Sequence, residues 1–545
     1  MLAPALLLLS SALSLAQLNV VPLPTNLASD PGCLLVPASF ALLPAGPGGA
    51  DALLAAALSR TRRALSSLAA RGESVSPCSP GASLADVTVF VGAALVKRTP
   101  ALGDDESYRL TLAADASLLN ASTVWGALRG LETLTQLISA DRASDAAGAR
   151  LVVPAAAVRV TDAPRFSHRG LMVDTGRAFL PLPVLLATLD AMAYAKLNVL
   201  HLHLSDDQAF PVDSAAWPLL AAKGAMQAPS RTHVYSGADI AAVVAAATAR
   251  GIRVVPEFDV PGHTASWFLG YPALESQCSQ SGGFGPPMDP TLNATYDFIA
   301  ALFGEMEGAF PDSFFHVGGD EVDFTCWENS PAIVAFMAAR GLTPPQLQLY
   351  FEERVVGLFG GRRDVLIWEG NAGAQNRYPA DANVVVNVWK EPMGNLSVLE
   401  GLVRAGRRVL YTTTDWYLDY PHLAGGKYDY HVNGEAQWQF VHGDPFANSS
   451  LTPAEMALVV GAEVCMWSPY EDATNFFPTV FPRAAAVAER LWSAPGAAVD
   501  APDALEARMH ALRCRMVARG IAAAPVKYGA SCPNPFTPAY APPYQ

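Results

Sequence analysis

The stretch RGLMVDTGRAFLPLPVLLATLDAMAYAKLNVLHLHLSDD, residues 169–207, decides the fold of most of this chain. It opens with a short apolar run over 169–174 and continues with an apolar segment of helical length over 182–197. A second apolar run, 198–206, follows the helix. A strand, a helix and a second strand in this order form a βαβ unit, because the helix returns the chain to the edge where the first strand began. The stretch therefore predicts two buried, parallel strands.

The alternation of strands and helices continues toward the C-terminus. Eight apolar runs follow one another after residue 168, and helical segments such as 237–251 lie between most of them. The expected strands are 169–174, 198–206, 252–259, 314–321, 365–370, 383–389, 408–414 and 462–467. Eight parallel strands over about 330 residues predict an α/β fold, a TIM (β/α)8 barrel with long loops. A doubly wound open sheet is the alternative.

The N-terminal part of the chain follows a different pattern. Helical periodicity covers 51–72, a strand-like run covers 85–92, and a helix with a Ser/Thr cap is expected over 122–139. These elements predict a small α+β domain in front of the barrel, and 545 residues suit two domains. The expected division is a signal peptide over 1–16, the α+β domain over 17–163, the barrel over 164–500, and a C-terminal helix and tail over 501–545.

The composition is typical of a folded, secreted protein. Hydrophobic residues make up 51% and charged residues 16% of the chain, a balance that supports packed cores rather than disorder. The net charge of −14 argues against a nucleic-acid partner, because little would neutralise phosphates. The first 16 residues resemble a secretory signal peptide, and no later run reaches the ~18 apolar residues of a membrane helix. We expect the secretory pathway, with a lysosomal, vacuolar or extracellular destination.

The cysteines and glycosylation motifs agree with an oxidising compartment. None of the seven cysteines lies in a CxxC pair, so a zinc site has no support, and we expect no metal. Pairing neighbours along the chain gives Cys33–Cys78, Cys278–Cys326 and Cys514–Cys532, although the sequence does not fix this connectivity. Cys465, inside an apolar strand, is expected to be a buried free thiol. Expected glycosylation sites are Asn120, Asn293, Asn395 and Asn448.

Polar and aromatic residues end the expected strands, where a barrel would bring them together. Asp320 and Glu321 stand side by side after two glycines at the end of the fourth strand. The residues at the other strand ends are Asp174 and Arg177, Asp206 and Asp207, Asp259 and His263, Trp368, Trp389, Tyr417 and Asp419, and Trp467. Carboxylates beside flat aromatic rings are typical of a carbohydrate site, because rings cover the apolar face of a sugar while charged groups bind its hydroxyls. Paired carboxyl groups can also protonate a leaving oxygen and stabilise an oxocarbenium-like transition state.

The segment HVGGDEV, 316–322, closely resembles the signature of the family 20 glycoside hydrolases, the β-N-acetylhexosaminidases. Further stretches resemble this family in the same order: RFSHRGLMVDTGRAFLPL (165–182), LHLSDDQAFP (202–211), PEFDVPGHTASW (256–267), DWYLDY (415–420) and FPRAAAVAERLWS (481–493). VWGALRGLETLTQL, 124–137, resembles the end of the family's small N-terminal domain. The resemblance covers nearly the whole mature chain. It implies a retaining hydrolysis in which the substrate's own 2-acetamido group is the nucleophile.

The resemblance also implies roles for the matched residues. Glu321 would be the general acid and then the general base, while Asp320 would hold the acetamide nitrogen and stabilise an oxazolinium intermediate. Asp206 and His263 would form a supporting relay toward Glu321. The implied sugar-binding residues are Arg177, Trp368, Trp389, Tyr417, Asp419 and Trp467. No cofactor is implied; the expected partners are a glycan with a terminal N-acetylhexosamine and a second copy of the chain in a homodimer.

One position departs from the family pattern. After the tryptophan of the eighth strand, the family usually has Trp-Gly-Glu or Trp-Ser-Glu, and this glutamate binds the sugar's 4-hydroxyl. Here the sequence reads Trp467-Ser468-Pro469-Tyr470-Glu471. Either Glu471 reaches the site from two positions later, or recognition of that hydroxyl is weaker. The choice between N-acetylglucosamine and N-acetylgalactosamine therefore stays open.

Two other functions fit parts of the sequence. His201 and His203, with Asp206 nearby, have the ligand spacing of metal-dependent amidohydrolases, because residues i and i+2 of a strand face the same side. Such an enzyme needs further ligands at the ends of later strands. His316 is a poor candidate, because it lies early in its expected strand, 314–321. The non-enzymatic alternative is a glycan-binding protein on an inactive hydrolase scaffold, which Pro469 favours weakly and the intact acids oppose.

Overall fold

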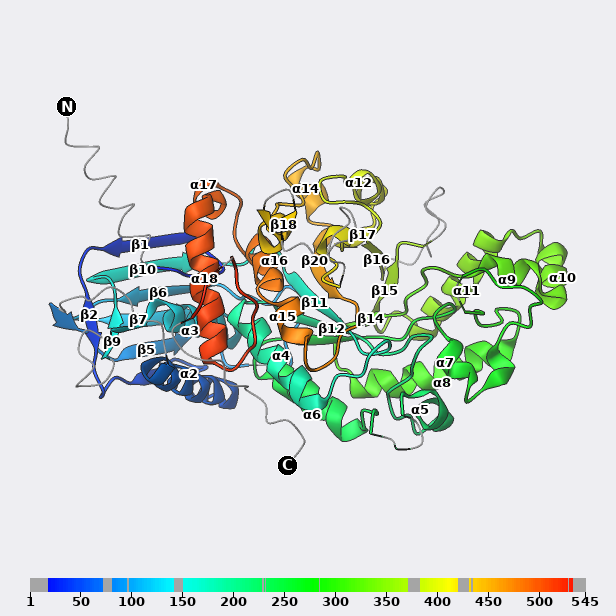
Figure 1. The fold of residues 1–545 in the computed structure, drawn as a ribbon, viewed down its shortest axis with the longest axis horizontal. Helices are drawn as coiled ribbons and strands as arrows, with labels where there is room; N and C mark the ends of the chain where they lie inside the picture. The colour runs from blue at the N-terminus through cyan, green and yellow to red at the C-terminus, as the bar shows by residue number, and fades with distance from the viewer. Residues whose placement is uncertain are drawn as a thin grey trace.

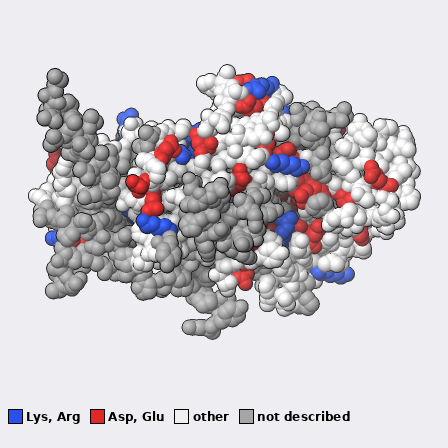
Figure 2. All heavy atoms as spheres, turned by 45° about the horizontal axis from the view of Figure 1, so that its top comes forward, with Lys and Arg blue, Asp and Glu red and all other residues white. Residues whose placement is uncertain are grey.

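The computed structural model of the chain describes residues 18–71, 81–95, 98–141, 150–227, 230, 232–283, 285–370, 383–419, 431–432, 435–527 and 529–532. These residues form an N-terminal α+β domain and a closed barrel, arranged next to each other along the longest axis of the molecule (Figure 1). The expected signal peptide, 1–16, lies outside the described residues. On the face drawn in Figure 2, acidic side chains gather in patches with basic ones scattered among them, in keeping with the net charge of −14.

The N-terminal domain is built on a six-stranded sheet in the order β1-β10-β6-β7-β5-β3. Its strands are β1 (Asn26–Asp30), β3 (Leu42–Ala45), β5 (Val87–Val91), β6 (Tyr108–Leu112), β7 (Ser117–Ala121) and β10 (Ala157–Asp162). A smaller sheet contains β2 (Leu34–Val36), β4 (Ala82–Ser83), β8 (Ser139–Asp141) and β9 (Arg150–Val153). The helices are α2 (Ala52–Arg71) and α3 (Val124–Leu137). As the sequence predicts, a Ser/Thr cap opens α3, because Oγ1 of Thr123 accepts the N–H of Gly126 at 3.1 Å.

Eight parallel strands close the barrel in the order β11-β12-β13-β14-β15-β16-β17-β20. They are β11 (His168–Asp174), β12 (Val199–His203), β13 (Arg253–Glu257), β14 (Phe314–His316), β15 (Asp364–Trp368), β16 (Val384–Val388), β17 (Arg408–Tyr411) and β20 (Val459–Met466). The predicted TIM barrel is thus confirmed. The doubly wound alternative is wrong, because β20 pairs with both β17 and β11 and leaves the sheet without an edge.

Helices surround the barrel and bury the outward faces of its strands (Figure 1). The longer ones are α4 (Leu182–Tyr194), α6 (Gly237–Thr248), α8 (Asn293–Ala309), α10 (Pro331–Arg340), α11 (Pro344–Phe359), α12 (Ser397–Arg404) and α16 (Arg483–Trp492). Shorter elements are α5 (Leu219–Gly224), α7 (Ala265–Phe268), η1 (Pro272–Leu274), α9 (Phe324–Glu328), η2 (Thr414–Trp416), β18 (His431–Val432), β19 (Glu435–Ala436), α13 (Gln437–Val441), α14 (Pro453–Met456), α15 (Phe476–Val480) and α17 (Ala497–Asp500). Among the described residues, no helix has the length and apolarity needed to cross a bilayer.

The last helix, α18 (Pro502–Ala518), returns to the N-terminal domain. The hydroxyl of Ser67 on α2 donates to the carbonyl of Ala518 at 3.2 Å. Arg515 donates to the carbonyl of Gln136 at 2.9 Å, and Arg519 pairs with Glu132 of α3 at 3.1 Å. The C-terminal segment therefore ties the two domains together.

Both expected disulfides whose two cysteines lie within the described residues, Cys278–Cys326 and Cys514–Cys532, form in the structure. The expected Cys33–Cys78 pair cannot be compared in this way, because Cys78 lies outside the described residues. Cys465 is buried and free, as predicted. The four sequon asparagines, Asn120, Asn293, Asn395 and Asn448, are all exposed. Their glycosylation stays a prediction.

A buried carboxylate joins the N-terminal domain to the barrel. Oε2 of Glu106 lies 2.6 Å from Nε of Arg129 in α3 and 2.8 Å from Nη2 of Arg169 in β11. Its Oε1 accepts the Asn198 amide at 2.8 Å. Burial alone would raise the pKa of Glu106, but the two guanidinium groups lower it to about 2. Glu106 is therefore ionised and compensates two buried cations at the domain interface.

Replacing Glu106 by Gln should lower the free energy of unfolding by about 3–5 kcal/mol at pH 7, because it leaves two buried guanidinium groups without an anion. The folded-state pKa lies below that of free glutamate, so this contribution is complete above about pH 4.3 and is lost as the pH falls toward 2. Urea denaturation at pH 7 and pH 3 should show the difference between wild type and variant shrinking at the lower pH. The exposed-site control Glu328→Gln should change stability by less than about 0.5 kcal/mol. If the loss of stability in Glu106→Gln is the same at both pH values, the assignment of an ionised Glu106 at the domain interface is wrong.

Candidate active site

The chain turns sharply where β14 ends. The strand stops at His316, although the sequence predicted it over 314–321. Gly318 and Gly319 have φ angles of 70° and 103°, in the left-handed region that favours glycine. A Cβ atom on Gly318 would lie 1.8 Å from Oδ1 of Asp259, so no larger residue fits there. The turn places the two acids that follow at the C-terminal end of the barrel.

Glu321 and His263 face each other at this end of the barrel. Both adopt positive φ angles, 49° for Glu321 and 53° for His263, which is uncommon for residues other than glycine and is concentrated at functional sites. Nε2 of His263 lies 3.5 Å from Oε2 of Glu321. The Glu321 side chain is 33% exposed, whereas His263 is buried. The carboxyl group of Glu321 can therefore meet a ligand on one side and the imidazole on the other.

Asp206 follows β12 and connects His263 to two further cations. Its Oδ1 lies 3.3 Å from Nδ1 of His263, and its Oδ2 lies 2.9 Å from Nε2 of His203 and 2.8 Å from Nη2 of Arg177. Burial alone would raise the pKa of Asp206, but the two histidines and Arg177 hold it well below its usual range. Burial opposes the charge on His263 too, yet hydrogen bonds with Asp206 and Glu321 raise its pKa well above the ordinary value. An anionic Asp206 thus orients a cationic imidazole toward Glu321.

A chain of histidines and glutamates continues from Asp206 through the barrel interior. Oε2 of Glu257 lies 2.7 Å from Nδ1 of His203 and 3.0 Å from Nε2 of His201. Glu463 contacts Nδ1 of His201 at 2.9 Å. Burial disfavours all of these charges, but Glu463 and Glu257 raise the pKa of His201 to about 9, and the surrounding histidines keep the pKa of Glu257 well below its usual range. Alternating charges therefore compensate one another and fix the rings beneath Asp206.

The metal hypothesis fits this interior poorly. One donor atom each of His201, Glu257 and His316 lies within 4.8 Å of the others, which would allow an ion. However, the Glu257 carboxylate already accepts the Trp368 indole N–H at 2.6 Å and contacts His203 at 2.7 Å. His203 hydrogen-bonds to Glu257 and Asp206, and His201 hydrogen-bonds to Glu463 and lies 3.0 Å from Glu257. The spacing that resembles a ligand pair therefore serves a network of histidines and carboxylates.

Asp320 lies against a second buried acid, Asp259. Asp259 accepts the N–H of Gly319 at 2.8 Å and is hydrogen-bonded to Asp320. Burial, followed by the charge of Asp320, raises the pKa of Asp259 well above its ordinary value. Burial raises the pKa of Asp320 as well, although the charge of His263 lowers it, so Asp259 is the acid of the pair that its surroundings drive furthest toward the protonated form. Oδ1 of Asp320 is buried and has no hydrogen-bond partner among the described residues. This is expected for an acceptor atom whose hydrogen bond comes from a bound ligand.

Four aromatic side chains form a wall beside these acids. Trp389 and Tyr417 are nearly parallel, with centroids 6.4 Å apart, and Tyr417 meets Trp467 edge to face at 5.8 Å. Trp368 lies 6.0 Å from Trp467. The guanidinium carbon of Arg177 stands 4.8 Å over the Trp467 ring, which joins the wall to the charged relay. Such a wall suits the apolar face of a sugar and a small apolar substituent.

The rim of the site carries further acids that hold the segment after Trp467. Oδ2 of Asp174 accepts the N–H of Ser468 at 3.1 Å. Tyr470 is 89% exposed and points outward, whereas Glu471 is buried. Burial, together with the charges of Glu471 and Asp174, raises the pKa of Asp419 to about 7. The charge of Glu471 therefore acts directly on Asp419, at the rim of the predicted site.

Comparisons with known proteins identify the family of the chain. The sequence profile of "Glycosyl hydrolase family 20, catalytic domain" matches residues 166–495, and that of "beta-acetyl hexosaminidase like" matches residues 20–137. The chain belongs to glycosyl hydrolase family 20. The beta-hexosaminidase subunit alpha of Rattus norvegicus is 40% identical over 439 residues, 79% of this chain and 78% of that protein. The beta-hexosaminidase subunit beta of Homo sapiens is 38% identical over 437 residues, 79% and 74% of the two chains.

Solved structures extend the similarity to the whole fold of this family 20 glycoside hydrolase. A chitobiase from Flavobacterium johnsoniae matches with a TM-score of 0.77 and 28% identity, over 92% of this chain and 73% of that one. A beta-N-acetylhexosaminidase from Bacteroides fragilis matches with a TM-score of 0.71 over 93% and 97% of the chains. At 20% identity, the second match supports the fold alone.

The structure brings most of the predicted catalytic and sugar-binding residues into contact with one another at the C-terminal end of the barrel. Their roles in catalysis and sugar binding stay predictions. The sequence analysis missed the structural roles of Glu257 and Glu463, which hold the histidines of the barrel interior. An available signal was an acid within a largely apolar strand, Glu463 in the middle of β20 and Glu257 at the end of β13.

Proposed function

We propose that this family 20 enzyme removes terminal, non-reducing, β-linked N-acetylglucosamine or N-acetylgalactosamine from glycoconjugates or chitooligosaccharides, with retention at C1. The observation that supports it most is the pair Asp320 and Glu321 after the end of β14, with an unpaired buried oxygen on Asp320 and a partly exposed carboxyl on Glu321. The two acids stand in different environments, as two different roles require.

In the proposed reaction, Glu321 protonates the glycosidic oxygen as the bond to C1 breaks. The acetamide carbonyl oxygen of the substrate attacks C1 and closes an oxazolinium ring. The carboxylate of Asp320 accepts the acetamide N–H and stabilises the positive charge that develops on the ring. Glu321, now ionised, removes a proton from the water that opens the ring at C1. The product keeps the β configuration because C1 is inverted twice.

The residues around Glu321 support both halves of this cycle. After Glu321 has given up its proton, the cationic His263, 3.5 Å away, stabilises the carboxylate. Asp206 holds His263 in this orientation, and Arg177 compensates the charge of Asp206. Tyr417 and the three tryptophans enclose the acetamide group and the sugar ring.

Glu471 is proposed to bind the sugar's 4-hydroxyl in place of the glutamate that the family carries at the position of Pro469. The outward turn of Tyr470 lets the chain bring Glu471 inward, near Asp419. The wild-type enzyme should hydrolyse 4-nitrophenyl N-acetyl-β-glucosaminide, and Glu471→Gln should lower kcat/KM for it by about 10- to 100-fold, the value of a hydrogen bond to a charged group. The ratio of kcat/KM for glucosaminide and galactosaminide should change as well.

The matched control for this measurement is Tyr470→Ala, one residue away but exposed to solvent. It should leave both kinetic constants within about twofold, because surface changes are usually small. An unchanged epimer ratio in Glu471→Gln contradicts the assignment of the 4-hydroxyl to Glu471, whereas no hydrolysis of either N-acetyl substrate by wild type contradicts the proposed function itself.

We further propose that the enzyme acts in the secretory pathway, in a lysosome or vacuole or outside the cell, and that it forms a homodimer. The expected leader, the disulfides and the exposed sequon asparagines support the compartment. Binding of nucleic acid is not expected at a net charge of −14.

A further inference from the structure

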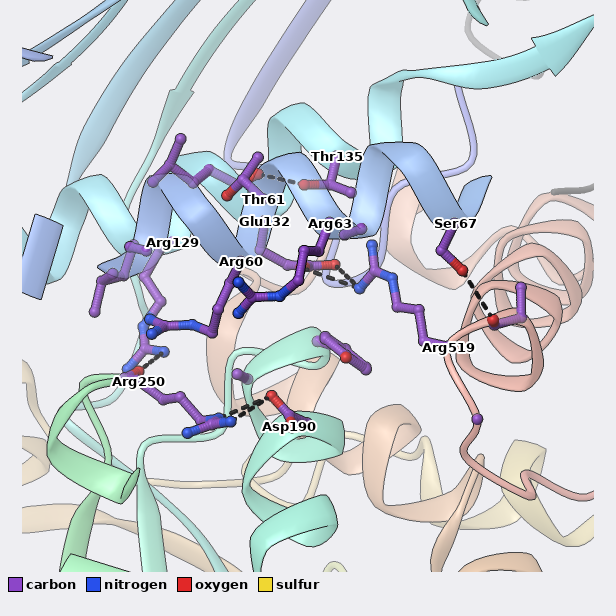
Figure 3. A pocket seen from close by; sticks show the side chains of 18 residues that line it. Arg60, Thr61, Arg63, Ser67, Arg129, Glu132, Thr135, Asp190, Arg250 and Arg519 are labelled. Atoms are coloured by element: carbon purple, nitrogen blue, oxygen red, sulfur yellow. Dashed lines mark hydrogen bonds and ion pairs between the residues drawn. The ribbon is translucent and has the colours of Figure 1, made fainter. Parts of the chain in front are cut away.

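A pocket of about 400 Å³ lies between the N-terminal domain and the barrel (Figure 3). Its walls come from α2, α3, the end of α4, the turn after α6 and the residues that follow α18. The turns after α4 and α6 lead into β12 and β13, so the pocket lies toward the N-terminal ends of the barrel strands. The site of Glu321 lies at their C-terminal ends, which are the opposite end of a parallel barrel. The pocket is therefore separate from the candidate active site.

The lining of this pocket is strongly basic in a chain whose net charge is −14. The arginines that line it are Arg60, Arg63, Arg129, Arg250 and Arg519. Only two acids, Glu132 and Asp190, stand among them. Five cations and two anions leave an excess of positive charge inside a concave surface.

Three of the arginines are engaged by carboxylates. Arg129 pairs with Glu106 at 2.6 Å, Arg250 with Asp190 at 2.8 Å, and Arg519 with Glu132 at 3.1 Å. Figure 3 shows the last two pairs along the pocket walls. Both acids of the lining are thus paired with other arginines, and neither forms an ion pair with Arg60 or Arg63 of α2.

Arg60 and Arg63 have no carboxylate partner among the described residues. Arg60 donates to the carbonyl of Ala249, and Arg63 donates to the Ser59 hydroxyl at 2.9 Å. Burial, followed by the nearby charge of Arg250, lowers the pKa of Arg60 to about 10, and the opposing charge of Asp190 compensates this only in part. The two side chains stand one turn apart on α2, and Figure 3 shows both extending into the pocket.

We propose that this pocket binds a small phosphorylated or sulfated molecule of about monosaccharide size, with its oxyanion held by Arg60 and Arg63. The planar guanidinium group offers paired N–H donors that match the oxygens of phosphate or sulfate. The volume lies within the range of about 300–1,000 Å³ of small-molecule sites and leaves room for a body larger than the oxyanion. The hydroxyls of Thr61 and Ser67 on the same wall can accept hydrogen bonds from a sugar.

A ligand in this pocket would stabilise the assembly of the two domains rather than change catalysis. It would touch the N-terminal helices, the barrel helices and the C-terminal segment at once, and binding to the folded state alone stabilises it by mass action. Because the proposed catalytic residues lie at the opposite end of the barrel, hydrolysis should be unaffected. This inference does not depend on the proposed function.

The test uses the full-length protein with glucose 6-phosphate and glucose 6-sulfate as separate probes. Calorimetric titration at pH 7 should give saturable binding of at least one of them, and the same probe should raise the thermal unfolding midpoint. Glucose is the control for binding through the sugar without an oxyanion. Sodium chloride at equal ionic strength is the control for a general effect of salt on charged groups. The relative affinities of the two probes distinguish phosphate from sulfate. Equal stabilisation by sodium chloride, or no binding of either probe, would overturn the proposal.

Two variants test the residues. Arg60→Ala combined with Arg63→Ala should weaken binding at least tenfold, while Arg109→Ala, an exposed arginine on β6, should leave it unchanged. Arg63→Glu, at an exposed position, reverses one charge with little risk to the fold and should abolish binding as well. The thermal unfolding midpoint without ligand serves as the check of folding in each variant. Binding that survives in Arg63→Glu protein with a normal unfolding midpoint would overturn the assignment.

Discussion

Replacing Glu321 by Gln should reduce kcat for an N-acetyl-β-glucosaminide by about 10²- to 10⁴-fold, the usual contribution of a general acid–base group. The amide keeps the size of the side chain and its place beside His263 but can neither protonate the leaving oxygen nor activate water. The loss should be larger for a disaccharide than for a 4-nitrophenyl glycoside, because nitrophenolate leaves readily without a proton. Steady-state kinetics on both substrates measure this difference.

The matched control is Glu328→Gln, an exposed glutamate on the neighbouring α9. It should retain full turnover on both substrates. A loss in Glu321→Gln smaller than about tenfold, or the same loss for good and poor leaving groups, contradicts the role of Glu321 as the acid.

Replacing Asp320 by Asn should reduce kcat by about 10²- to 10³-fold, as expected when a group that stabilises developing charge is lost. The carboxylate of Asp320 is proposed to meet the oxazolinium ring through its unpaired Oδ1, and an amide cannot compensate the positive charge there. An inhibitor that mimics this ring should lose affinity in parallel with kcat, because both report on the transition state.

The control for this variant is Asp297→Asn, an exposed aspartate on α8. Binding of the product N-acetylglucosamine should weaken far less than binding of the charged mimic in Asp320→Asn. Equal weakening of product and mimic would mean that Asp320 acts as a general sugar-binding group and not on the charged intermediate.

Much of the fold could be predicted because its signals are local. Each barrel strand is a short apolar run, and helical segments separate most of these runs, so the order of elements predicted parallel strands, although an open sheet was still possible until β20 was seen to pair with β11. The fourth strand was predicted too long, over 314–321, because Gly318 and Gly319 look like strand residues until the close approach of Asp259 is known. Backbone direction at such a turn depends on contacts between distant segments.

The residues of the candidate site at the strand ends could be predicted from the sequence, but the contacts in the barrel interior that support them could not. Position at the end of a parallel strand brings Arg177, Asp206 and Glu321 together whatever the details of packing. The contact between His201 and Glu463 joins residues that are 262 positions apart, and nothing local indicates it. The raised pKa of Asp259 cannot be predicted from the sequence either, because it depends on burial and on the charge of Asp320.

The most direct test of the central claim is a comparison of two substrates that differ only at C2. Wild-type enzyme is given 4-nitrophenyl N-acetyl-β-glucosaminide and 4-nitrophenyl β-glucoside at pH 5 and pH 7. If the substrate's acetamide is the nucleophile, kcat/KM for the glucoside should be lower by about 10³-fold or more, since an intramolecular nucleophile is worth at least this much. Comparable hydrolysis of both substrates would contradict the account.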